Sequence, residues 1–186
     1  YAEGLYVECL RGKEAGSQYV IGTRKGIKND VPIVPAYGLN REGSGDMYPK
    51  GGNMLHTIRQ VINDDEKWRG ILRGLNQTFR HQVVTGRQVQ EYISRGAGID
   101  FSRVYQQYLT TTRIPRLEYR IEGATLSYRW VNVVPGFDLP IRVTLADAGY
   151  SVIRPSEAWQ SAGVSLREPS SFRIDPNFYV EAAPVP

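Results

Sequence analysis

The sequence predicts an α+β protein, in which a helical array over residues 1–112 is followed by a small β-sandwich-like domain over residues 113–186. The spacing of apolar residues changes near residue 112 from a helical period to strict alternation. Proline changes at the same place, since three of the 11 prolines lie in residues 1–110 and eight in residues 111–186. A chain of 186 residues, 41% of them hydrophobic, can bury a sizeable core as one large domain or two small ones.

Helical spacing of apolar residues marks the first part. Thr85 has the position of an N-cap before Val89, and Asp100 can cap the last helix. The stretch from Asn29 to Asp46 is rich in Pro and Gly and is expected to be an irregular loop. Each apolar stripe needs a neighbour, so we expect a packed helical array. The predicted helical stretches are residues 2–10, 13–27, 54–62, 68–79, 85–93 and 100–109.

Alternating apolar residues mark the second part. Residues 117–121 and 126–130, with a turn at Glu122 and Gly123, predict a β-hairpin with one buried face. A third strand is expected at Ile141–Leu145. Short candidate strands at regular spacing favour a sandwich-like module, and they are Ser151–Arg154, Gly163–Arg167 and Asn177–Glu181.

Composition excludes several classes of protein. The formal net charge is +4, and the basic residues are scattered among acidic ones, so we expect no nucleic-acid partner. No stretch approaches the ~18 uninterrupted apolar residues of a membrane span. A single cysteine excludes an internal disulfide and a Cys-rich zinc module. Because the chain opens at Tyr1 without an initiator Met, we interpret it as a fragment or a processed product.

Most residues that could perform chemistry have a structural interpretation. His56 and His81 are 25 residues apart, and neither has the i, i+4 partner of a helical zinc site. We interpret His56 as a helix-face residue with a local hydrogen bond, and His81 as a helix-end residue. Cys9 is expected to be a small buried hydrophobe. The run Asp64–Glu66 is typical of an acidic first helical turn, so no metal ligand is assigned in this chain.

The segment Gly43–Leu55 differs from the rest of the chain because a Gly-rich loop leads directly into a helix. Pro49 suits the first turn of that helix. Tyr48 then lies at the helix start, with its phenol free to point out of the bundle. Taken alone, this pattern also fits a tyrosine that only packs.

Several segments, in order, resemble the aminopeptidase N-like zinc metallopeptidases, which are gluzincins of peptidase family M one. Tyr48-Pro49-Lys50-Gly51 resembles their Tyr-x-Lys-Gly helix, with Pro49 in place of the usual acidic or aromatic residue. The opening Tyr1-Ala2-Glu3 resembles the end of their motif Asn-Glu-Gly/Ser-Phe-Ala-x-Tyr-x-Glu. The resemblance extends to about residue 145, over stretches that include residues 12–16, 19–25, 64–69 and 108–115.

This resemblance implies the C-terminal portion of a zinc-dependent hydrolase, an aminopeptidase that cleaves N-terminal peptide bonds of a peptide substrate. The three zinc ligands and the general-base Glu would all precede Tyr1, in the upstream half of the catalytic domain. Tyr48 is the only catalytic residue carried over, as the donor of a hydrogen bond to the oxyanion. Lys50 and Gly51 are interpreted as structural, with Lys50 solvated. The resemblance also favours an exported protein. We expect this chain alone to bind no zinc and to be inactive.

Two alternatives stay open. The parent protein could be a non-catalytic relative that acts as a protein- or glycan-binding scaffold, and a search of the residues before Tyr1 for His-Glu-x-x-His would distinguish it. The β-rich part could instead be an independent module that binds a protein or glycan. Exposed aromatic side chains clustered on one face would favour that module, and the candidates are Trp130, Trp159, Phe178 and Tyr179.

Overall fold

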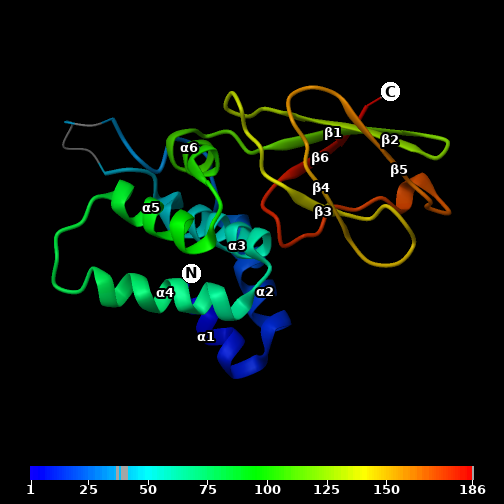
Figure 1. Ribbon diagram of the computed structural model, residues 1–186. Helices are drawn as coiled ribbons and strands as arrows, with labels where there is room; N and C mark the ends of the chain where they lie inside the picture. Colours follow the sequence, from blue (N-terminus) through cyan, green and yellow to red (C-terminus); the bar gives the residue numbers. More distant parts are fainter. Residues whose placement is uncertain (37, 39–41, 186) are drawn as a thin grey trace.

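The computed structural model describes residues 1–36, 38 and 42–185, and it shows helices followed by strands (Figure 1). The predicted α+β class, with a helical part followed by a small β part, is therefore confirmed. Residues 37 and 39–41 of the predicted loop lie outside the described residues. The helices are α1 (Ala2–Arg11), α2 (Lys13–Gly22), α3 (Pro49–Ile62), α4 (Asp65–Thr78), α5 (Gly86–Ala97) and α6 (Ser102–Thr110), with short 3-10 turns η1 (Thr23–Gly26), η2 (Gly45–Met47) and η3 (Pro169–Ser171).

Helix α3 is the centre of the helical part, since it contacts α2, α4 and α6 (Figure 1). Its apolar stripe is buried at Met54 and Ile58, as its spacing predicted. Its other buried side chains are polar or charged, namely Lys50, Asn53, His56, Thr57, Arg59 and Gln60. A helix this deep in the fold therefore needs partners for polar groups on several sides.

The predicted cap at Thr85 is present, while the N-cap position of α6 is Phe101 and Asp100 lies one residue before it. The backbone N–H of Gln88 donates to Thr85 Oγ1 over 3.2 Å, while the N–H of Thr85 donates to Gln88 Oε1 over 2.8 Å, which makes a capping box at the start of α5. Asp100 Oδ1 accepts the N–H of Ser102, the first residue of α6, over 2.8 Å. Both side chains thus satisfy orphan donors at helix starts.

The β part contains two sheets. The larger has the order β5-β2-β1-β6, and β3 pairs with β4 in the smaller. The predicted hairpin is confirmed, because β1 and β2 are antiparallel with Leu117 opposite Trp130. One face of this hairpin is covered, with Leu126 and Trp130 fully buried. The strands are β1 (Arg116–Glu122), β2 (Thr125–Val131), β3 (Ile141–Val143), β4 (Ser151–Ile153), β5 (Gln160–Gly163) and β6 (Glu181–Pro184).

The last two strands lie elsewhere than predicted. Strand β5 ends at Gly163, where the predicted strand began, and β6 begins at Glu181, where the predicted strand ended. Both strands carry small or polar side chains that are mostly exposed, and they are held by backbone pairing with β2 and β1. The apolar residues that suggested strands, such as Val164 and Phe178, instead fill the core from irregular segments.

Helix α1 buries a different face from the one predicted. The apolar spacing of Leu5, Tyr6, Cys9 and Leu10 predicts that these side chains are buried on one face of the helix over residues 2–10. This prediction was wrong, since Tyr6 is 66% and Leu10 60% exposed and Cys9 is also exposed. The helix instead turns Gly4 towards α2, where a Cβ atom on Gly4 would lie 2.4 Å from Val20. Two glycines, Gly4 and Gly16, allow the backbones of α1 and α2 to approach closely.

The contact between α1 and α2 gives a testable prediction. In a Gly16→Ala variant the new Cβ would lie 2.6 Å from the Cβ of Glu8 and 2.9 Å from the carbonyl oxygen of Gly4, so the helices must separate. We expect the free energy of unfolding to fall by about 1–3 kcal/mol, measured by chemical denaturation. Gly22→Ala is the control, because nothing lies within 4 Å of that position and alanine favours a helix. Equal stability of the two variants would contradict the close approach.

One cluster of buried apolar side chains continues from the helices into both sheets, and it includes Trp68, Tyr108, Leu117 and Trp130. Polar contacts join the same parts, since Thr57 Oγ1 accepts the N–H of Tyr179 over 3.0 Å. The division into domains at residues 112 and 113 stays a prediction. None of the helices in the described residues is both long enough and apolar enough to cross a membrane.

Candidate functional site

Tyr48 lies directly before α3, and its side chain is 78% exposed. Pro49 occupies the first turn of the helix, as predicted, and the carbonyl of Tyr48 accepts the first helical hydrogen bond, from the N–H of Gly52 over 2.9 Å. The structure therefore places the phenol outside the packed core, while its backbone belongs to the helix start. The catalytic role of Tyr48 stays a prediction.

The approach to Tyr48 is held by a buried carboxylate. Asp46 Oδ2 accepts the backbone N–H of Asn29 over 2.7 Å, and Asp46 Oδ1 accepts that of Lys28 over 3.0 Å. Ser44 Oγ accepts the N–H of Asp46 and donates to Asp30 Oδ1 over 2.9 Å. These bonds connect η2 to the segment after η1, so the residues before Tyr48 have fixed positions.

Hydrogen bonds of buried side chains hold the start of α3 against α2, η1 and the end of α6. Asn53 Nδ2 donates to the carbonyl of Val20 over 3.1 Å, and Asn53 Oδ1 accepts from Arg24 Nε over 2.6 Å. Lys50 is 1% exposed, and its Nζ donates to the carbonyl of Thr111 over 2.8 Å. The expectation that Lys50 is solvated was therefore wrong. The apolar stem of Lys50 is buried under the first turn of α3, and its ammonium group reaches the carbonyl of Thr111, directly after α6. Burial lowers the pKa of this ammonium group.

A cleft of about 260 Å³ opens beside Tyr48. The start of α1, the end of α2 with η1, and the start of α3 form its walls. Tyr19 lies at this cleft and donates its hydroxyl to Glu3 Oε2 over 3.1 Å, and that hydrogen bond raises the pKa of the Tyr19 phenol. The lining residues are Tyr1, Ala2, Glu3, Gly4, Tyr19, Val20, Thr23, Tyr48, Pro49 and Gly52.

The two histidines do not take part in this cleft. His56 is buried, and its Nε2 lies 2.8 Å from Asn177 Oδ1 in the β part, with Gln60 Nε2 at 3.4 Å. Its main hydrogen bond is thus long-range, where a local one was expected. His81 lies in the turn after α4 and accepts from Arg80 Nε over 3.1 Å. Cys9 is also apart from the cleft, on the exposed side of α1.

The burial of His56 gives a pH-dependent prediction. Burial lowers the pKa of its imidazole in the folded state, with Arg59 and Arg24 acting in the same direction. The unfolded chain therefore takes up a proton first, near pH 6.5, and the contribution of His56 to stability is lost as the pH falls from about 6.5 towards the lowered pKa. In a His56→Gln variant we expect the free energy of unfolding to fall less over that interval. Parallel wild-type and variant curves from denaturation at several pH values would contradict this.

Within residues 1–36, 38 and 42–185, no three His, Cys, Asp or Glu side chains gather closely enough to hold a metal ion. The predicted acidic helix start is confirmed at Asp64–Glu66, because Asp64 caps α4 by accepting the N–H of Lys67 over 2.9 Å. The donors in the described part of the chain therefore do not fit a zinc site.

The aromatic residues expected of a binding module do not share an exposed face. Trp130 and Phe178 are buried in the core, and Tyr179 is half-buried against Tyr108. Trp159 is exposed, but its ring lies next to the guanidinium of Arg129, at 4.7 Å, and that of Arg120, at 5.6 Å. This arrangement does not favour the glycan-binding alternative.

Comparison with known proteins finds likeness in structure alone. No protein-family model matches the chain, and no curated protein does. The fold is similar to part of a solved structure, that of Legionella pneumophila aminopeptidase A in complex with aspartic acid, with a TM-score of 0.62 and 14% sequence identity. The likeness covers 90% of this chain and 22% of that chain, so the chain spans about a fifth of its length. The fold of this chain is thus similar to that of a segment of that aminopeptidase.

Proposed function

We propose that this chain is the C-terminal portion of a zinc-dependent metallopeptidase of the aminopeptidase type, in which Tyr48 stabilises the oxyanion of the tetrahedral intermediate. The observation that supports this most is the exposed phenol of Tyr48 at a cleft, on a helix start that a buried polar network holds in place. The fold likeness to an aminopeptidase supports the hydrolase class.

The chemistry asked of Tyr48 is the donation of one hydrogen bond. As water adds to a peptide carbonyl, negative charge develops on the carbonyl oxygen, and a preorganised O–H aimed at that oxygen stabilises the transition state more than the ground state. Removal of one such donor costs about 3 kcal/mol in other hydrolases. A donor on a rigid element is suited to this role because it needs little reorganisation during the reaction.

The rest of the active site is proposed to come from the upstream half of the catalytic domain. Zinc, its ligands and the general base would lie there, and zinc supplies an activated water and polarises the carbonyl when it is bound. The exposed apolar side chains of α1, Tyr6 and Leu10, offer a surface on which that half could pack. Glu3 and Tyr19 line the cleft together with Tyr1, and the Tyr19 hydroxyl donates to Glu3.

An assay of two proteins tests the proposal. The chain alone and the full-length protein are each incubated with zinc and an aminoacyl fluorogenic substrate, and zinc binding is followed by calorimetry. We expect turnover and stoichiometric zinc from the full-length protein, and neither from residues 1–186. A full-length protein that binds zinc and releases no product would contradict the peptidase. Absence of both zinc binding and turnover would favour the non-catalytic scaffold.

A further inference from the structure

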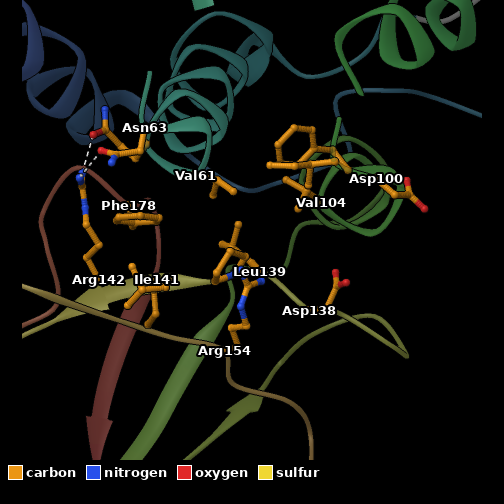
Figure 2. A pocket seen from close by; sticks show the side chains of 15 residues that line it. Val61, Asn63, Asp100, Val104, Asp138, Leu139, Ile141, Arg142, Arg154 and Phe178 are labelled. Atoms are coloured by element: carbon orange, nitrogen blue, oxygen red, sulfur yellow. Dashed lines mark hydrogen bonds between the residues drawn. The ribbon is translucent and has the colours of Figure 1, made fainter. Parts of the chain in front are cut away.

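A second cavity, of about 250 Å³, lies between the helical part and the smaller sheet, away from Tyr48 (Figure 2). Its upper wall comes from the end of α3 and the start of α6, and its lower wall comes from β3, β4 and the segment before β3. No residue of this cavity also lines the cleft at Tyr48. The two sites are therefore separate.

The cavity has an apolar interior and apolar edges. Leu139 and Ile141 on the lower wall and Phe101 at the start of α6 on the upper wall line the interior, and all three are almost completely buried. Ile99, between α5 and α6, and Val152, on β4, stand at the opening and are exposed. An aliphatic side chain that entered here would cover apolar surface that now faces water, which is favourable.

Arg142 forms one rigid end of the cavity. Its guanidinium pairs with the buried Asp175 over 2.8 Å and lies 5.4 Å from the ring centre of Phe178. It also donates hydrogen bonds to Gln60 Oε1 over 2.6 Å and to Asn63 Oδ1 over 3.2 Å, which are the dashed lines in Figure 2. These contacts neutralise its charge and fix the wall. Arg142 therefore shapes the cavity and leaves little charge for a ligand.

Two opposite charges at the rim lack such partners. Figure 2 shows Arg154 and Asp138 on the lower wall, and both residues are exposed. Neither side chain makes an ion pair or a hydrogen bond with any part of the chain that the structure describes. Asp100, across the opening, already accepts from the N–H and the hydroxyl of Ser102. Among the residues that the structure describes, the rim thus presents Arg154 and Asp138 without ionic partners beside an apolar interior.

We propose that this cavity binds an amino-acid-sized zwitterion with an aliphatic side chain. The carboxylate would contact Arg154, the ammonium group would contact Asp138, and the side chain would lie between Phe101 on the upper wall and Leu139 and Ile141 on the lower wall. The volume of about 250 Å³ is below the roughly 300–1,000 Å³ of pockets that enclose drug-sized ligands. The inference rests on this cavity alone and goes beyond the role proposed for Tyr48.

Nuclear magnetic resonance on the isotope-labelled 186-residue chain tests the proposal. The probe is L-leucine, and a ligand of this size on a partly solvated rim is expected to bind with a Kd on the order of 1 mM. Backbone shifts should move at Ile99, Leu139 and Val152 and should not move around Tyr48. Leucinamide, which lacks the carboxylate, and N-acetyl-leucine, which lacks the ammonium group, should each bind about tenfold more weakly. Glycine, without the side chain, should show no binding.

Two variants of exposed rim residues test the contribution of each charge to ligand binding. In Arg154→Gln the preference for leucine over leucinamide should disappear, and in Asp138→Asn the preference over N-acetyl-leucine should disappear. Arg167→Gln is the matched control, because this exposed arginine pairs with Asp147 and is absent from the cavity lining. Retention of both preferences in the two rim variants would overturn the proposal. Shifts confined to other residues, or no saturable shift with leucine, would overturn it as well.

Discussion

A Tyr48→Phe variant of the full-length protein is expected to show a kcat about 100- to 1,000-fold below that of the wild type, with KM almost unchanged. Only the phenolic O–H is removed, and its hydrogen bond is proposed to form in the transition state. An interaction made only there changes kcat and kcat/KM equally. Steady-state kinetics with an aminoacyl substrate measures both parameters.

The structure provides a stability control for the Tyr48 experiment. Because the ring is 78% exposed, loss of its hydroxyl should leave the free energy of unfolding within about 0.5 kcal/mol of the wild type. Tyr150→Phe is the matched variant, since Tyr150 is also exposed and lies in the β part, away from the cleft. A Tyr48→Phe enzyme with a kcat similar to that of Tyr150→Phe would remove Tyr48 from the mechanism.

The sequence predicted the elements whose apolar residues recur at a clear helical or strand spacing and whose ends carry capping residues. The stripe of α3 and the N-cap at Thr85 are encoded within a few residues, so their positions could be derived directly, while the participation of Gln88 in a capping box is seen only in the structure. Strands β5 and β6 could not, because their small exposed side chains carry no alternation and their pairing partners lie far along the chain.

In the candidate site too, local features could be predicted from the sequence and long-range contacts could not. The position of Tyr48 at a helix start followed from Pro49 and the Gly-rich loop before it. The hydrogen bonds of Lys50 and Asn53 could not be predicted, because both look like ordinary polar helix residues in the sequence. Their partners are distant along the chain, since Val20 lies on α2 and Thr111 directly follows α6. Asp138 and Arg154 are likewise brought to the rim of the same cavity only by the tertiary fold.

Arg59 provides the largest expected effect on stability. Its side chain is 4% exposed, and it donates from Nη1 and Nη2 to the two carboxylate oxygens of Glu8, over 2.5 and 2.9 Å, and from Nε to Asp65 over 2.8 Å. These bonds join α1, α3 and the start of α4. An Arg59→Gln variant leaves the Glu8 carboxylate without its paired cation and leaves Asp65 with only the exposed Lys13, so we expect the free energy of unfolding to fall by about 3–5 kcal/mol.

The pH dependence of stability distinguishes loss of this network from general damage. Hydrogen bonds from Arg59 lower the pKa of Glu8 and bring that of Asp65 to about 2, so their contribution is complete above about pH 5 and is lost progressively as the pH falls towards 2. Chemical denaturation from pH 7 to pH 2 should therefore show a steeper acid decline in the wild type than in Arg59→Gln. Lys13→Gln is the matched control, because Lys13 pairs with the same Asp65 but is 61% exposed, and its loss should cost less than about 1 kcal/mol. Equal costs for the two variants would show that burial of Arg59 does not decide the strength of the network.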